Sequence, residues 1–143
     1  MANNYHPICS HNRRRYDCKE CYGKVFCEHD RRLRECSRCC PEGAYKMAQR
    51  SAKKRQLTFE LTLEEFTWIV SASCSFCGDS YEPMTCDRVD STKGYRFDNS
   101  QPLCHQCNML KKDLPDEVFL NGLDRLRRHI EKMMKHQSVL KAA

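Results

Sequence analysis

The stretch from residue 74 to residue 112 reads CSFCGDSYEPMTCDRVDSTKGYRFDNSQPLCHQCNMLKK. A C-x2-C pair stands at the start of this stretch and another near its end, with 26 residues between the two pairs. Four thiolates at such a spacing are typical of a closed, tetrahedral zinc site. We therefore predict a structural zinc ion held by Cys74, Cys77, Cys104 and Cys107.

The sequence between the two pairs predicts a small β-structure. Residues 85–90 are typical of a strand, residues 91–95 of a glycine-containing loop, and residues 96–99 of a second, short strand. A helix is predicted over 105–113, beginning just after Cys104, the first cysteine of the second pair. This helix would carry Asn108, Lys111 and Lys112. The two lysines are either solvated charges or contacts to a phosphate group.

A repeated zinc motif occupies the N-terminal part of the chain. The pattern C-x-H-x6-C-x2-C occurs twice, and the two copies are offset by 18 residues. Three thiolates and one imidazole complete a tetrahedral zinc shell. The few apolar residues here cannot form a core, so metal binding would supply the folding free energy. The predicted ligands are Cys9, His11, Cys18 and Cys21 in the first copy and Cys27, His29, Cys36 and Cys39 in the second.

Two alternatives to this assignment remain open at the level of sequence. The ligands of the two copies could be interdigitated, or the cysteines could form disulfide bonds. The repeat, over about residues 8–41, resembles small Cys/His zinc modules that occur in tandem in proteins of algae, oomycetes and large DNA viruses. That resemblance implies no catalytic chemistry.

The start of the chain bears on the choice between zinc and disulfides. The sequence MANNYHPICS lacks the basic and apolar segments of a signal peptide, and no apolar run reaches the length of a membrane span. We therefore expect a protein that is neither secreted nor bound to a membrane. A reducing compartment, such as a host cytoplasm or nucleus or a virus particle, disfavours disulfides and favours three zinc sites.

Charge is distributed unevenly along the sequence. Residues 1–55 carry 14 basic and 6 acidic side chains, residues 56–90 carry 1 and 7, and residues 91–143 carry 10 and 6. Basic flanks around an acidic centre fit a phosphate-binding surface beside a cation site, although solvated helix faces are the alternative. DNA or a protein partner could contact the zinc repeats. The candidate phosphate contacts there are Arg13, Arg14, Arg15, Arg31 and Arg32.

Flanking segments predict further elements. Residues 44–55 favour a short, exposed basic helix, and residues 57–61 alternate like a strand. Thr62 and Glu65 fit a capping box that opens a helix to about Ser71. Its expected buried side is Leu63, Phe66, Trp68, Ile69 and Val70. Pro115 opens a last helix with an apolar stripe, which we expect to pack on the preceding unit: Phe119, Leu123, Leu126, Ile130 and Met133.

The segments CDRVDSTKGYRFDN and PLCHQCNMLKKDL, together with the preceding C-x2-C pair, resemble the HNH nucleases. The match is closest to the branch with D-R-x-D, a GY loop and C-x2-C-N, and it covers roughly residues 48–125. The resemblance implies a ββα metal finger that cleaves DNA. It also implies Asp87 and Asn108 as ligands of Mg2+ or Mn2+, and Asn99 as the residue that steadies the loop.

The general base departs from the HNH pattern, because Arg88 stands where the family has histidine. An arginine stays protonated near neutral pH and cannot accept a proton. Asp90 or His105 could act as the base, or Arg88 could contact phosphate while another group takes the proton. A chain that no longer cleaves DNA is the remaining alternative.

We therefore expect a small, zinc-stabilised α+β protein with three parts. Residues 1–42 would hold the tandem zinc units, residues 43–55 a basic linker helix, and residues 56–143 an HNH-like module with a C-terminal helix. The expected function is metal-dependent hydrolysis of DNA phosphodiester bonds. The alternative is a noncatalytic zinc protein that binds nucleic acid or serves as a structural component, for example of a large virus particle.

Overall fold

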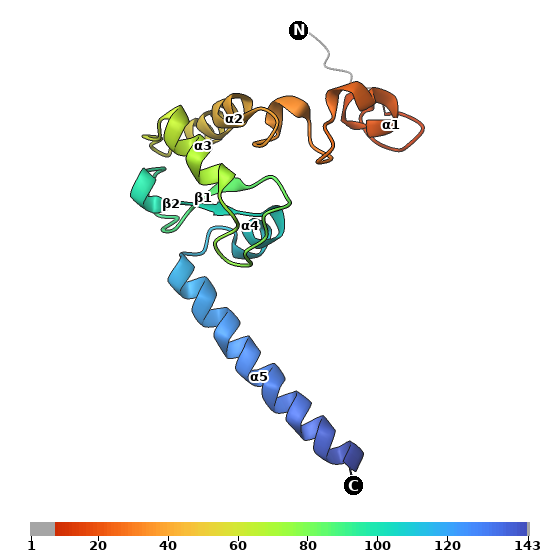
Figure 1. Cartoon of the computed structure of the whole chain (residues 1–143), viewed down its shortest axis with the longest axis vertical. Coiled ribbons are helices and arrows are strands. Elements are labelled where there is room, and N and C mark those ends of the chain that lie inside the picture. Colours follow the sequence, from red (N-terminus) through yellow and green to blue (C-terminus); the bar gives the residue numbers. More distant parts are fainter. Residues whose placement is uncertain (1–7, 143) are drawn as a thin grey trace.

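A computed structural model describes residues 8–142, apart from the side chains of Tyr22 and residues 135–142. Figure 1 shows the zinc repeats at one end, the sheet and α4 in the middle, and α5 extending away from them. The mixture of helices with a two-stranded sheet confirms the predicted α+β class. The elements are α1 (Lys19–Tyr22), α2 (Pro41–Lys54), α3 (Leu63–Ser71), β1 (Thr85–Arg88), β2 (Ser100–Leu103), α4 (His105–Lys111) and α5 (Asp116–Ala142).

Strands β1 and β2 pair antiparallel, with Asp87 opposite Gln101. The second strand lies later than predicted, because residues 97–99 form a 3-10 turn and pairing begins at Ser100. The first strand ends at Arg88 because the amide of Asp90 donates to the side chain of Asn99 instead of to a strand. Helix α4 follows β2 at once, which produces the expected ββα order.

The hydrophobic core lies between α3 and the sheet, with α2 packed against α3. Its buried side chains include Ala52 from α2 and Ile69 from α3. The prediction of an exposed linker helix was wrong, since Ala44, Tyr45 and Ala48 of α2 also pack against this core. Small residues on one side let α2 lie close to α3. The remaining core residues are Leu61, Phe66, Val70, Cys74, Met84, Tyr95, Leu103 and Cys104.

Helix α3 begins with the predicted capping box. The Thr62 hydroxyl accepts from the Glu65 amide at 3.1 Å, and the Glu65 carboxylate accepts from the Thr62 amide at 2.8 Å. Phe66 is buried as expected, but Leu63 and Trp68 are exposed. Position 68 lies about 200° around the helix from position 66, so it faces away from the core. The Trp68 ring instead packs on Phe97, with 5.5 Å between centroids.

The segment 57–61 does not form the predicted strand. It makes one isolated bridge, between Phe59 and Tyr95, supported by the bond from the Tyr95 amide to the Thr58 carbonyl at 2.9 Å. Gly94 permits this close approach, because a Cβ there would overlap the Thr58 backbone and side chain. The contact joins the loop after β1 to the core beneath α2.

Helix α5 contacts the rest of the protein only near its first turns, within the described side chains. The Phe119 ring stacks on Phe76 with a centroid distance of 5.3 Å, and the Asp116 amide donates to the Val89 carbonyl at 3.0 Å. The other four stripe residues named above are exposed. The expectation that the whole stripe packs on the module was therefore wrong: the helix leaves the module after its root (Figure 1).

The second zinc repeat is attached to the module by close contacts. The buried Ser37 hydroxyl donates to the Met84 carbonyl at 2.7 Å. At the start of α2, a Cβ on Gly43 would overlap the Arg34 carbonyl oxygen, so only glycine fits this approach. Contacts at Ser37 and at Gly43, before and after residue 40, therefore hold the second repeat against the core.

Candidate functional site

Three clusters of cysteine and histidine lie at the predicted positions. In each cluster the four ligand atoms lie within 4.8 Å of one another. His11 Nδ1 lies 3.8, 3.3 and 3.6 Å from the sulfurs of Cys9, Cys18 and Cys21. Ligand atoms around a tetrahedral zinc ion are separated by about 3.5–3.8 Å, given Zn–S near 2.3 Å and Zn–N near 2.0–2.1 Å. The donor set and spacing fit zinc.

The two N-terminal clusters repeat the same geometry and share no ligands. His29 Nδ1 lies 3.8, 3.7 and 3.4 Å from the sulfurs of Cys27, Cys36 and Cys39. Each cluster takes its four ligands from one copy of the motif, so the ligands are not interdigitated. In the third cluster, the sulfurs of Cys77 and Cys104 lie 3.7 Å apart, which also fits two ligands of one zinc ion.

A tight turn presents the first ligands of each N-terminal cluster. The Cys9 amide donates to the Arg13 carbonyl at 2.8 Å, and the equivalent bond from Cys27 to Arg31 is 2.9 Å. The turns need a left-handed residue, which is Asn12 with φ of 56° in the first copy and Asp30 with 55° in the second. Asn and Asp adopt this conformation more readily than other non-glycine residues. The sequence repeat is therefore also a structural repeat.

A cavity of about 330 Å³ lies beside the sheet and contains several predicted site residues. Asp87 and Arg88 of β1 line one side, while Asn108 of α4 and the following Lys112 line another. The structure thus brings together the two metal ligands that the HNH resemblance implied. His105 lies elsewhere and lines a separate hollow with residues 29–31 and 82–83.

Lys111 forms the centre of a buried ionic network behind this cavity. Its ammonium lies 2.8 Å from Asp87 Oδ2 and 3.3 Å from Asp116, and it donates to the Arg88 carbonyl at 2.7 Å. Gln101 joins Asp116 to Asp87 through its amide nitrogen. Both alternatives predicted for Lys111, a solvated charge or a phosphate contact, were wrong, because its side chain is fully buried. A buried ammonium needs carboxylate partners, and two surround it.

Arg88 holds the loop after β1. Its guanidinium donates to the carbonyls of Ser91 and Lys93, the latter at 2.8 Å, and lies over the Tyr95 ring at 5.4 Å from the centroid. One nitrogen also lies 3.6 Å from the Asp113 carboxylate. The side chain is 5% exposed, so most of the guanidinium is committed to the protein and its remaining surface faces the cavity.

Asp90 caps the turn that follows. Its carboxylate accepts from the amide and hydroxyl of Thr92 at 3.0 and 2.6 Å and pairs with Lys93 at 2.9 Å. The bonds from Thr92, and then the bond from Lys93, lower the pKa of this carboxyl to about 2. A carboxylate with that pKa is a weak base. Asp90 does not line the cavity, so its geometry does not support the role of general base.

Asn99 ties the two ends of this loop together. Its side-chain oxygen accepts from the Asp90 amide at 2.9 Å, and its nitrogen donates to the carbonyls of Asp90 and Gly94 at 3.1 and 2.9 Å. The side chain is buried and has its full complement of backbone partners. The loop that contains the Arg88 contacts is therefore fixed from within.

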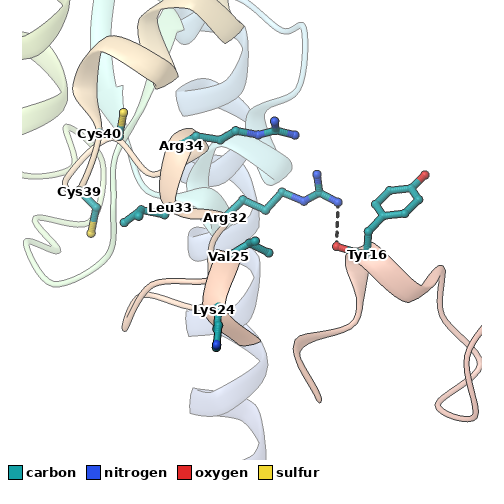
Figure 2. A pocket seen from close by; sticks show the side chains of 8 residues that line it. All are labelled: Tyr16, Lys24, Val25, Arg32, Leu33, Arg34, Cys39 and Cys40. Carbon is teal, nitrogen blue, oxygen red and sulfur yellow. Dashed lines mark hydrogen bonds between the residues drawn. The ribbon is translucent and has the colours of Figure 1, made fainter. Parts of the chain in front are cut away.

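The basic residues of the zinc repeats fall into two groups. Arg13, Arg14 and Arg15 are exposed. Arg31 is half-buried, and the Arg32 guanidinium is occupied by an ion pair with Asp17 and a 3.1 Å bond to the Tyr16 carbonyl. Figure 2 shows Arg32 reaching across to Tyr16 in the 840 Å³ hollow between the repeats. Arg32 therefore joins the two repeats.

Sequence reasoning missed two charged residues that line the cavity. Asp113 follows α4 directly, where Lys112 adopts a φ of 53° and turns the chain back. Arg55 stands at the end of α2 and lies 3.4 Å from the Asp113 carboxylate. Lys112 and Asp113 are adjacent in the sequence, but the contact with Arg55 spans 58 residues and depends on how α2 packs. No local pattern could have revealed that contact.

Comparisons with known proteins agree with this architecture. The chain is similar in structure to the rare-cutting HNH restriction endonuclease PacI, with a TM-score of 0.50 and 21% sequence identity over 70% of this chain and 82% of that one. The chain therefore has an HNH-like fold. In sequence it is 32% identical over 78 residues to an uncharacterised protein of Acanthamoeba polyphaga mimivirus. That match covers 53% of this chain and 15% of the viral protein.

No family model matches the chain. Within residues 8–142, no helix combines the length and the apolar character that crossing a bilayer requires.

Proposed function

We propose that this protein is a metal-dependent endonuclease of the HNH type, which hydrolyses phosphodiester bonds in DNA. The observation that carries the proposal is the cavity beside the ββα unit, where Asp87 and Asn108 meet basic side chains. The HNH-like fold and the neighbouring thiolate cluster support it. We further propose that the exposed arginines of the zinc repeats contact the DNA backbone.

The donor set in the cavity fits a hard divalent cation. Asp87 and Asn108 offer carboxylate and amide oxygens, which suit Mg2+ or Mn2+. Within the described residues, the contacts of Asp87 engage Oδ2, and this leaves Oδ1 available as a ligand. Such a cation supplies charge stabilisation to the oxygen that leaves phosphorus. Lys111 would hold the Asp87 carboxylate in one orientation.

The other residues of the cavity supply contacts and a proton acceptor. The exposed Lys112 ammonium would attract the phosphate, and the part of the Arg88 guanidinium that faces the cavity would contact its oxygens. Two carboxylates line the cavity, Asp87 and Asp113. With Asp87 engaged by the cation, we assign the role of proton acceptor for the attacking water to Asp113.

A plasmid-nicking assay tests the proposal. Wild-type protein with Mg2+ or Mn2+ should convert supercoiled DNA to the open-circular form, and Asp87→Ala should lower the rate by at least about a hundredfold. Asp79→Ala provides a matched control, because Asp79 is also a carboxylate of the module but does not line the cavity. Equal nicking by wild type and Asp87→Ala would show that the cation site is misplaced.

The proposed proton acceptor is tested by a second matched pair. Asp113→Asn should lower the nicking rate by about a hundredfold, in the range that general-base catalysis contributes. Asp90→Asn removes the same charge but keeps an oxygen that can cap the Thr92 turn, so it should retain most of the activity. If Asp90→Asn is the more damaging change, the general base is Asp90 and the assignment to Asp113 fails.

One observation favours the noncatalytic alternative. Arg88 stands at the usual base position and is committed to backbone carbonyls and to Tyr95. This alternative expects wild-type protein to bind DNA but to leave it intact with every divalent cation tested. The Arg88→His variant separates the two proposals further. If wild-type protein does not nick DNA but Arg88→His does, the scaffold retains a usable cation site.

A further inference from the structure

The part of α5 that projects from the module carries an uncovered apolar stripe. Beyond the buried Phe119, the side chains of Leu123, Leu126, Ile130 and Met133 are 43%, 55%, 45% and 49% exposed. The helix spans 27 residues, or about 40 Å at 1.5 Å per residue. Helices of this kind depend on burial of an apolar face, and the described residues supply no surface that covers this one.

The stripe has the spacing of a coiled coil. Its residues stand at 119, 123, 126, 130 and 133, so the intervals alternate between four and three residues. The sequence continues the same register with Gln137 and Leu140, which extends it to about three heptads. A mean repeat of 3.5 residues keeps one seam facing a second helix along its whole length.

Charges beside the seam are neutralised within the helix. The Arg127 guanidinium pairs with Asp124 at 2.9 Å and with Glu131 at 3.1 Å, and Arg128 pairs with Asp124 at 2.6 Å. Arg127 occupies a flanking position of the heptad register. Because its charge is already paired, two identical helices can approach without repulsion between their arginines.

We propose that α5 pairs with α5 of a second copy of this chain, so that the protein is a homodimer joined through a coiled coil. A second copy carries the same stripe in the same register, and a two-fold axis therefore makes the surface complementary to itself. Leucine, isoleucine and methionine side chains have no hydrogen-bond donors for phosphate, which disfavours DNA as the occupant of the seam. The dimer does not depend on whether the cavity cleaves DNA.

Sedimentation equilibrium of the full zinc-loaded chain tests the dimer. Wild-type protein should reach twice the chain mass of 16.9 kDa at micromolar concentration. Leu126→Glu and Ile130→Glu place a charge in the seam and should each raise the dimer dissociation constant by at least about a hundredfold. Val118→Glu is the matched control. It lies on the same helix, about 100° from the centre of the stripe, and should leave the constant unchanged.

A stabilising variant keeps the test decisive if the glutamate variants misfold. Gln137→Leu replaces a polar residue in the seam register and should tighten the dimer by about tenfold or more. A wild-type protein that stays monomeric up to about 100 µM overturns the proposal. So do glutamate variants that keep their zinc content and dimerise as wild type does. A monomer whose DNA affinity falls in Leu126→Glu would instead show that nucleic acid covers the stripe.

Discussion

The zinc repeats and the HNH-like module differ in what surrounds their buried residues. Among residues 8–40 whose burial is described, only Cys18, Cys36 and Ser37 are buried, and the first two belong to the clusters that fit zinc. The module instead buries a cluster of ten hydrophobic residues that includes Phe66 and Ile69. One region is thus built around its metal sites, whereas the other combines a metal site with a packed core.

Similar ligand sets can therefore contribute different shares of the stability of the region that contains them. Apolar residues of the repeats, such as Ile8 and Leu33, are exposed by 61% and 50% and contribute little burial. A structural zinc ion provides an apparent binding free energy of about 10–16 kcal/mol, which is comparable to the entire net stability of a folded domain, about 5–15 kcal/mol. In the module, Cys74 and Cys104 are also members of the core, so metal binding and packing support each other.

The largest expected effect follows zinc removal. Protein purified without added metal should contain about three zinc ions per chain by plasma emission analysis. After chelation under reducing conditions, amide protection should disappear from residues 9–39, because metal binding supplies the free energy that folds them. Helices α2 and α3 should retain more protection in the same hydrogen-exchange experiment. Repeats that stay protected without metal would show that they fold without zinc.

A smaller effect is expected from the buried ammonium of the module. Lys111→Met leaves Asp87 and Asp116 without their shared cation and should lower the free energy of unfolding by about 3 kcal/mol. The matched control is Lys112→Met, since Lys112 is the adjacent lysine and is exposed, and its change should stay within about 0.5 kcal/mol. Urea unfolding of the zinc-loaded protein measures both. Similar midpoints for the two variants would mean that the network contributes no net stability.

Truncating one apolar side chain should destabilise the module more than the zinc repeats. Ile69→Ala in the module should lower the free energy of unfolding by about 2–5 kcal/mol, because Ile69 is 1% exposed. Leu33→Ala in the second repeat should lower it by less than about 1 kcal/mol. Thermal and urea unfolding at saturating zinc give both values. A larger loss for Leu33→Ala would reveal an apolar core in the repeats.

The smallest expected effect concerns DNA binding by the repeats. Replacing three exposed arginines with glutamine should flatten the dependence of log K on log salt by up to about 3, since each phosphate contact contributes about 0.9. The control removes three charges from α5 and should alter the slope less. Titrations of a labelled duplex at several salt concentrations compare Arg13→Gln, Arg14→Gln and Arg15→Gln combined with Arg125→Gln, Arg128→Gln and Lys132→Gln combined.

Local patterns in the sequence predicted the metal ligands and the order of elements. Ligand spacing within each motif is short, so a turn or a pair of turns determines which sulfurs meet, and all twelve predicted ligands cluster as expected. The capping box at Thr62 and Glu65 is also a local motif and is confirmed. Hydrophobic periodicity succeeded where a face packs on the core, as at Phe66 and Ile69.

Long-range packing accounts for what the sequence did not reveal. A lysine seldom lies buried, and only the positions of Asp87 and Asp116 in space explain the burial of Lys111. The stripe of α5 has the period of a packed helix, yet periodicity does not say which molecule covers it. Asp113 and Arg55 meet across 58 residues and leave no sequence signature.

The glycine at the junction between the second repeat and α2 determines more than a local fit. With Gly43 against the Arg34 backbone and Ser37 bonded to Met84, the repeat cannot swing relative to the cavity. The second repeat is thus held at a fixed distance from the proposed point of cleavage, and Arg32 connects this repeat to the first one, which carries the exposed arginines. On a duplex bound by both the exposed arginines and the cavity, the cut would fall a constant number of base pairs from the phosphates that the arginines contact, whatever the intervening sequence. A bulkier residue at position 43 would make the distance between the contacted phosphates and the cut variable before it weakened DNA binding or cleavage.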